Sequence, residues 1–264
     1  MKNPKDLNRE AWNIRAKKHL DTTFYDMSAF KSGASSLKEI ELGLLPDLSG
    51  LKVLHLQCHF GQDSLSLALM GAQVTAVDFS EEAINIARGL SKEMDLPVHF
   101  ICSDVMAPDL LQGETFDLIF MSYGVLTWHE DLSPLAELIE RCLDPDGRLL
   151  LVEFHPHMQM YDDSNTTIEH SYFLDGPISG MQEGTYATEK DTEPIPYVVW
   201  NHSLGEVLNT LIGAGLILEF VQEYDFSPYP CFENLVQVDE ERWMVKGLEG
   251  KIPMCFAVRA RKAD

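Results

Sequence analysis

The sequence predicts an α/β protein built on a mainly parallel β-sheet. Between residues 50 and 155, short apolar runs alternate with amphipathic helical patterns, an order that is typical of consecutive βαβ units. The chain has 264 residues, and 45% of them are hydrophobic. A chain of this size can bury the core of one α/β domain with embellishments, whereas a second full domain would have little room. We therefore predict a single domain with an insertion.

Five apolar runs are the predicted strands of this region: 53–56, 74–77, 98–101, 116–120 and 149–154. The helix after the first strand has leucines on one face and ends at Gly71, which suits a helix C-cap. The next helix begins at Ser80, an N-cap followed by two glutamates that the helix dipole favours. Ser133 and Pro134 open the helix that precedes the fifth strand.

The strand and helix alternation stops after the fifth strand and resumes at Ser203. Residues 155–202 mix turn residues with short apolar pieces, and loops of this length are usually functional or mobile. Ser203 and Glu206 form the capping-box pattern of a helix that ends at Gly215. Two further strands follow, at 217–224 and 253–261. Before the first strand, the pattern Ser36 to Glu39 predicts another capped helix.

Composition disfavours several classes of partner. Twenty Lys and Arg residues against 42 Asp and Glu residues give a net charge of −22, whereas nucleic-acid binding relies on basic side chains that neutralise phosphates. The five cysteines are odd in number and contain no C-x-x-C pair, so neither a disulfide framework nor a zinc site is indicated. No segment approaches the ~20 apolar residues of a membrane span. We expect a cytoplasmic protein without nucleic-acid or membrane partners, and the oligomeric state is not predicted.

The turn after the first strand, in VLHLQCHFGQDS (residues 53–64), has the position of a nucleotide-binding turn but few glycines. In a dinucleotide fold, the second glycine of G-x-G-x-x-G lets the backbone approach a pyrophosphate. Gln57 and His59 stand where small residues would be expected, and His59 would obstruct that approach. A nucleoside without a pyrophosphate relaxes the requirement, and S-adenosylmethionine is such a ligand. We expect Gly61 to be the position that must stay bare.

Two aspartates follow the next strands. Asp78 lies 17 residues after Gly61, a spacing that suits a carboxylate accepting hydrogen bonds from ribose hydroxyls. Asp104 follows the third strand and is placed to meet the exocyclic amine of adenine. Each aspartate taken alone is better explained as an ordinary cap or turn residue. Their order after Gly61, at the carboxyl ends of successive strands, favours a ligand site.

The segments VLHLQCHFGQDSLSLALMGAQVTAVDFS, SDV, FDLIFMSYGVLTWHEDL, LDPDGRLLLVEFHP and WNHSLGEVLNTLIGAGL resemble class I S-adenosylmethionine-dependent methyltransferases, in a bacterial subgroup with LQCH in the first motif. The resemblance implies a Rossmann-like, doubly wound sheet of seven strands with helices on both faces, in which the last strand is antiparallel. It also implies a set of cofactor contacts: Tyr25, Gln57, Cys58, His59, Gly61, Asp63, Ser64, Asp78, Phe79, Ser80, Ser103, Asp104, Val105, Ser122 and Tyr123.

Methyl transfer from a sulfonium is an in-line displacement, so alignment and the exclusion of water supply much of the acceleration. An acceptor with a high pKa also needs a base, for which the sequence offers His155, Glu153, His202, His129 and His157. Four residues are predicted to contact the acceptor: Trp128, His157, Tyr186 and Trp200. The HPH sequence has no evident third ligand, so no metal is expected.

We therefore predict a methyltransferase acting on a small molecule, with a non-catalytic binder of the cofactor or a nicotinamide oxidoreductase as alternatives. The single domain 1–264 divides into four predicted parts: an N-terminal helical lid (1–49), a cofactor-binding core (50–154), a substrate-side insertion (155–202) and a C-terminal helix and strand pair (203–264). The N-terminal part either closes over the cofactor as a lid or packs as an exposed helix.

Overall fold

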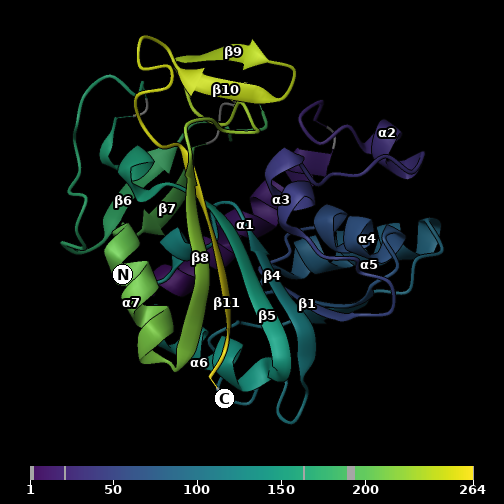
Figure 1. Cartoon of the computed structure of the whole chain (residues 1–264). Coiled ribbons are helices and arrows are strands. Elements are labelled where there is room, and N and C mark those ends of the chain that lie inside the picture. The colour runs from purple at the N-terminus through teal and green to yellow at the C-terminus, as the bar shows by residue number, and fades with distance from the viewer. Residues whose placement is uncertain (1–2, 21, 163, 189–193, 264) are drawn as a thin grey trace.

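The computed structural model describes residues 3–20, 22–162, 164–188 and 194–263. Its centre is a seven-stranded sheet with the order β3-β2-β1-β4-β5-β11-β8 (Figure 1). The strands are β1 (Lys52–Leu56), β2 (Gln73–Asp78), β3 (His99–Cys102), β4 (Phe116–Ser122), β5 (Leu143–Phe154), β8 (Leu216–Tyr224) and β11 (Cys255–Lys262). The last strand, β11, runs antiparallel to both β5 and β8, while β1 to β5 pair in parallel. The predicted fold class is confirmed.

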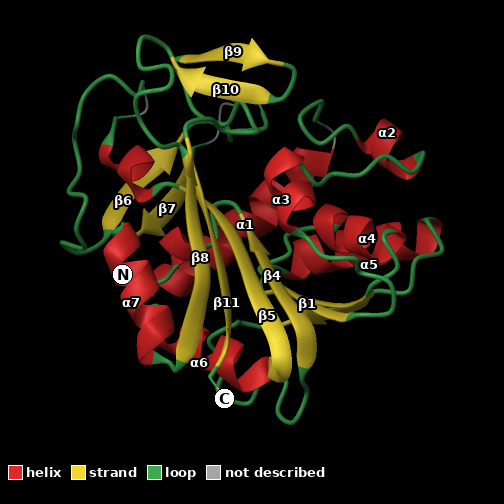
Figure 2. Ribbon diagram, in the orientation of Figure 1, coloured by secondary structure: helices red, strands yellow, loops and turns green. Residues whose placement is uncertain are grey.

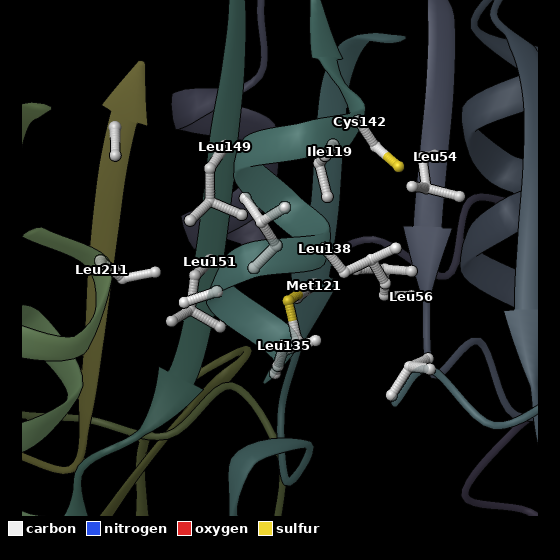
Figure 3. Close-up of a cluster of buried hydrophobic side chains, with 14 of the residues drawn as sticks. Leu54, Leu56, Ile119, Met121, Leu135, Leu138, Cys142, Leu149, Leu151 and Leu211 are labelled. Atoms are coloured by element: carbon white, nitrogen blue, oxygen red, sulfur yellow. The ribbon is translucent and has the colours of Figure 1, made fainter. Parts of the chain in front are cut away.

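Helices cover both faces of this sheet (Figure 2). The elements α4 (Gln62–Leu69) and α5 (Glu81–Glu93) pack on one face, and α6 (Ser133–Cys142) and α7 (Leu204–Gly213) pack on the other. The central strands β1 and β4 are buried along most of their length, because helices cover both faces. In β5, Leu149 and Leu151 join the core under α6 and α7, whereas Leu150 and Val152 face the opposite core. Figure 3 shows the first of these cores, with Leu135 and Leu138 of α6 against the strands.

Three helices precede the sheet: α1 (Pro4–Leu20), α2 (Met27–Lys31) and α3 (Glu39–Leu44). The longest, α1, packs against α5 and against the insertion. Its Asn8 side chain exchanges two hydrogen bonds with the backbone of Val198, at 2.6 and 3.0 Å, and its Asn13 accepts a hydrogen bond from Ser80 at 2.7 Å. The α1 helix therefore joins the β2–α5 turn to the insertion.

Two hairpins were not predicted from the sequence. The first lies in the insertion and pairs β6 (Ile178–Gln182) with β7 (Ile195–Val199). The second pairs β9 (Leu235–Asp239) with β10 (Arg242–Val245). Gly180 in β6 and Pro196 in β7 weaken the strand pattern, because both residue types are depleted in strands. Two 3₁₀ turns also occur, η1 (Leu126–Trp128) and η2 (Pro156–Met160).

The predicted helix starts are correct at Ser80 and Ser203 and wrong at Ser36. The Ser203 hydroxyl accepts from the Glu206 amide at 3.2 Å, as an N-cap does. The Ser36 hydroxyl instead donates to Asp63 at 2.6 Å, and the helix begins at Glu39. Tertiary contact with α4 gives the Ser36 hydroxyl a charged acceptor, which outweighs a local cap.

No helix among the described residues is long and apolar enough to cross a membrane.

Candidate functional site

The turn after β1 takes a glycine-like conformation without most of the glycines. Gln57, His59 and Gly61 have φ values of 57°, 52° and 82°, in the left-handed region that costs a non-glycine residue about 1 to 2 kcal/mol. Hydrogen bonds hold this conformation. The side-chain amide of Gln57 donates to the Val125 carbonyl at 2.9 Å, and the His59 backbone N–H donates to the Asp78 carboxylate at 2.8 Å. Residues after β2 and β4 therefore stabilise the strained turn.

The position of Gly61 excludes a side chain for a reason that the sequence did not reveal. A Cβ atom at this position would lie 2.7 Å from the Phe100 ring and 3.0 Å from the Ala87 side chain. The constraint is therefore the packing of α4 and its turn against β3 and α5. This is the third-glycine role in dinucleotide motifs, where close helix and strand packing needs the missing side chain.

Asp78 ends β2 and is only 8% exposed. Its two carboxylate oxygens accept backbone hydrogen bonds, from Ser80 at 2.9 Å and from His59 at 2.8 Å. Burial raises its pKa to about 6, and the backbone donors partly oppose that rise. Each oxygen has a second lone pair, so the carboxylate retains capacity for a ligand hydroxyl while it ties two turns together.

A cavity of about 250 Å³ lies beside this turn. We call this cavity the edge pocket. Six of the predicted site residues line it: Gln57, Phe79, Asp104, Val105, Trp128 and Trp200. They come from the carboxyl ends of β1, β2 and β3, from η1 and from the insertion. Open α/β sheets bind ligands at this edge, beside the point where the strand order reverses, and here that point lies between β1 and β4.

Acidic side chains dominate the charge of the edge pocket. Asp104, Glu130 and Asp131 line it, and Lys5 of α1 is the basic side chain among its lining residues. The Lys5 ammonium is in direct contact with the Asp104 carboxylate. A pyrophosphate would therefore meet mostly negative charge, whereas a cationic ligand would be attracted.

Sequence reasoning missed several lining residues: Lys5, Asn8, Met106, His129, Glu130 and Asp131. The sequence offers His129 as a base but does not place it in a pocket. The α1 residues lie about fifty positions before the turn they cover, and no local pattern connects the two segments. Polar residues in the HEDL segment after β4 were the one available signal.

The other predicted cofactor residues, Asp78 and Gly61 included, are not among the residues that line the edge pocket. Asp63 accepts from Ser122 at 3.0 Å, Ser64 contacts His55 Nδ1 at 2.8 Å, and Tyr123 donates to Glu41 at 2.7 Å. Tyr25 shares a 2.6 Å hydrogen bond with Tyr186. The Ser103 amide donates to the Asp78 carbonyl at 2.9 Å, and Cys58 is buried, which raises its thiol pKa.

The predicted base Glu153, near the end of β5, is engaged with the protein backbone. Glu153 accepts hydrogen bonds from four backbone amides, those of Gly124, Val125, Leu126 and Phe154. This carboxylate anchors the connection after β4. The geometry favours a structural role for it.

The predicted histidines His155, His157 and His202 are also engaged with other groups of the protein. His155 Nε2 lies 3.0 Å from Glu223, and its Nδ1 accepts from the His157 amide at 3.3 Å. His157 contacts the Pro253 carbonyl, and His202 uses its two nitrogens on Glu206 and the His129 carbonyl, at 2.9 and 2.7 Å. None of these three histidines is among the residues lining the edge pocket.

His129 does line the edge pocket, and its tautomer follows from its partner. Its Nε2 lies 3.1 Å from Gln57 Oε1, which can only accept. The proton is therefore on Nε2, and Nδ1 is the basic nitrogen of the neutral ring. Burial lowers the pKa of His129 to about 4, so the ring is neutral near pH 7.

Among the described residues, no group of three His, Cys, Asp or Glu side chains is arranged to hold a metal ion.

The central part of the chain matches a known protein family. Residues 53–147 match a family model described as a methyltransferase domain, and they contain the turn, Asp78, Asp104 and His129. These residues are therefore a methyltransferase domain. The predicted family is confirmed, and the LQCH subgroup stays a prediction.

The chain is also similar to curated proteins. A demethylmenaquinone methyltransferase of Clavibacter sepedonicus is 35% identical over 108 residues, which are 40% of this chain and 42% of that protein. An uncharacterized methyltransferase, YbaJ, of Bacillus subtilis is 25% identical over 187 residues, covering 69% and 72% of the two chains. The match with the first of these thus spans less than half of the relative.

Solved structures share the fold of this chain. An S-adenosylmethionine-dependent methyltransferase from Mesorhizobium loti has a TM-score of 0.59 at 22% identity, over 88% of this chain and all of that one. The magnesium protoporphyrin IX methyltransferase of Synechocystis, solved with bound S-adenosylhomocysteine (SAH), has a TM-score of 0.56 at 14% identity, over 99% and 100% of the chains.

Proposed function

We propose that this chain binds S-adenosylmethionine in the edge pocket and catalyses methyl transfer to a small-molecule acceptor. The charge of the pocket carries the proposal. Three carboxylates, of Asp104, Glu130 and Asp131, against one ammonium suit a cationic sulfonium nucleoside. The aromatic faces of Phe79 and Trp128 suit a flat base. The same acidic lining opposes the alternative of a nicotinamide dinucleotide.

Two observations support a small acceptor. The net charge of −22 disfavours a nucleic-acid substrate, and one relative is named for methylating demethylmenaquinone. The insertion contributes Trp200 to the edge pocket, with an indole N–H that is buried and has no partner among the described residues. We propose that the Trp200 N–H orients the acceptor, because an unpartnered buried donor favours a ligand that accepts from it.

The chain's part in the chemistry is to bind, to orient and to exclude water. The bound cofactor supplies an activated methyl group with a neutral thioether as its leaving group. The α1 helix, tied to the insertion through Asn8, covers the edge pocket, and we propose that it limits the access of water. His129 offers a basic Nδ1 for acceptors that must lose a proton.

Calorimetric titration tests the proposed cofactor. We expect S-adenosylmethionine and SAH to bind, and NADH not to bind. If neither adenosyl compound binds at millimolar concentration, or if NADH binds tightly instead, the proposal is wrong. A screen of methyl acceptors then separates an enzyme from a non-catalytic binder, since only the enzyme accumulates SAH.

Replacement of Asp78 by Ala should weaken SAH binding by about 2 kcal/mol, the value of a lost hydrogen bond to a charged group. Titration calorimetry measures the affinity, and thermal unfolding reports how far the loss of the His59 and Ser80 bonds loosens the turn. Asp109→Ala, at an exposed position, is the matched control. Unchanged affinity in a folded Asp78 variant would refute the ribose assignment.

His129 and His155 can be compared once the screen supplies an acceptor with a hydroxyl or carbon nucleophile. We expect His129→Asn to lower turnover at saturating cofactor by about 10²-fold, the usual contribution of a general base. His155→Asn should change turnover little, because its imidazole pairs with Glu223 away from the edge pocket. The reverse order of effects would restore His155 as the base.

A further inference from the structure

Three nitrogen-bearing side chains meet beneath α1, beside the edge pocket. Arg15 and His19 lie four residues apart on α1, and therefore on one face of the helix. They are 2% and 0% exposed. The His59 ring, from the turn after β1, lies 5.2 Å from the His19 ring. We call Arg15, His19 and His59 the Arg15 cluster.

The Arg15 cluster has buried nitrogens without partners. Among the described residues, Arg15 Nη1, both ring nitrogens of His19 and Nε2 of His59 make no hydrogen bond and are inaccessible to solvent. Within the described part of the chain, the guanidinium donates one hydrogen bond, from Nη2 to Gln182 of β6 at 3.1 Å. Buried polar groups in proteins are nearly always paired. Four unpartnered nitrogens in these neighbouring side chains therefore indicate a missing ligand.

The charge of the Arg15 cluster suits an anion of one negative charge. No Asp or Glu among the described residues forms an ion pair with Arg15. Burial, together with the positive charge of Arg15, lowers the pKa of His19 to about 3, and burial lowers the pKa of His59 well below its usual value. The two imidazoles are thus neutral near pH 7, and each can donate one N–H. One guanidinium charge with two neutral donors matches a carboxylate better than a phosphate dianion.

Aromatic rings connect the Arg15 cluster to the edge pocket. The guanidinium carbon of Arg15 lies 5.3 Å from the centre of the Trp12 ring and 5.6 Å from that of Trp128. Trp128 also lines the edge pocket. A ligand that occupies the edge pocket could therefore extend past Trp128 and reach Arg15 with one polar group.

We propose that Arg15, His19 and His59 bind the carboxylate of a ligand in the methyltransferase site. The inference rests on the proposed function, since that function supplies the ligand. Two molecules in such a reaction could carry this carboxylate, the amino-acid tail of the cofactor and the acceptor. A guanidinium with a free Nη1 binds a carboxylate through a charge-assisted hydrogen bond, and each imidazole contributes an N–H.

Binding measurements test the proposal without a known acceptor. The first pair of probes is SAH and its decarboxylated analogue, which differ only in the carboxylate. The second pair is benzoate and benzamide, titrated into the free protein and into its complex with SAH. Each probe is titrated into the wild-type protein, Arg15→Met and Lys17→Met. Lys17 is exposed on the same helix, so its variant controls for the loss of a positive charge.

If the cofactor carries the carboxylate, SAH binds the wild type at least tenfold more tightly than its analogue, and Arg15→Met removes the difference. If the acceptor carries it, benzoate but not benzamide binds at least tenfold more weakly to Arg15→Met. The proposal is overturned if Arg15→Met changes neither the SAH preference nor the benzoate affinity by more than twofold. If the wild type binds neither nucleoside, the proposed function fails, and the benzoate titration alone decides this inference.

A second variant covers the case in which Arg15→Met does not fold. His19→Phe keeps an aromatic ring of similar shape among Trp12, Tyr25 and Tyr186 but removes two of the unpartnered nitrogens. We expect it to weaken the same carboxylate preference about threefold, with Arg15 still in place. An unchanged preference in folded His19→Phe would equally overturn the proposal.

Discussion

Gly61→Ala is expected to destabilise the protein by about 3 kcal/mol. The new Cβ would lie 2.7 Å from the Phe100 ring, and the φ of 82° at this position disfavours any side chain. Overpacking of a close-packed core and a left-handed non-glycine residue each cost about 1 to 3 kcal/mol. Chemical denaturation of the two proteins, monitored by circular dichroism, measures the difference in the free energy of unfolding.

Gly89 is the matched control for this substitution. It lies inside α5, where an added Cβ meets no atom within 4 Å. Gly89→Ala should therefore stabilise the protein by up to about 1 kcal/mol, because alanine favours the helix. In a double-mutant cycle, Phe100→Leu should relieve part of the Gly61→Ala cost. Purely additive effects would show that the Phe100 contact does not cause the loss.

Glu41→Gln is expected to make stability less dependent on pH. Glu41 is fully buried in α3, accepts from Tyr123 at 2.7 Å, and lies near Asp63. Burial raises its pKa from 4.5 to about 7, and the charge of Asp63 adds to the rise. The folded protein therefore binds more protons than the unfolded chain between these two values. The contribution of Glu41 to stability is fully present below pH 4.5 and is lost as the pH rises through 7.

The expected change in the free energy of unfolding follows from the shift in the pKa of Glu41. The free energy of unfolding of the wild type, relative to Glu41→Gln, should fall by about 3 kcal/mol from pH 4.5 to pH 8. Denaturation curves at five or six pH values measure it. Glu39→Gln is the control on the same helix. Arg242 lowers the pKa of the exposed Glu39 carboxylate, so the contribution of Glu39 to stability changes with pH in the opposite direction. A constant difference for Glu41→Gln would contradict the prediction.

Much of the core fold followed from local patterns. The seven sheet strands and the helices between them were predicted close to their observed positions, since buried parallel strands are continuous apolar runs and capped amphipathic helices carry local signals. The β6–β7 and β9–β10 hairpins were missed. The β6 and β7 strands lie twelve residues apart in the chain, and Gly180 and Pro196 blur the alternation that defines a strand.

The sequence by itself placed Gln57, Asp78 and Asp104 near one another at the carboxyl edge of the sheet, where we propose a nucleoside site. That outcome follows from strand order, because the ends of adjacent parallel strands meet. The tertiary structure alone decided which side chains remain free to act. It gave Glu153 four backbone donors and paired His155 with Glu223. It also left Arg15 Nη1 and both ring nitrogens of His19 buried without a partner among the described residues. Hydrogen bonding and burial depend on residues that are distant in the chain, and no local pattern contains them.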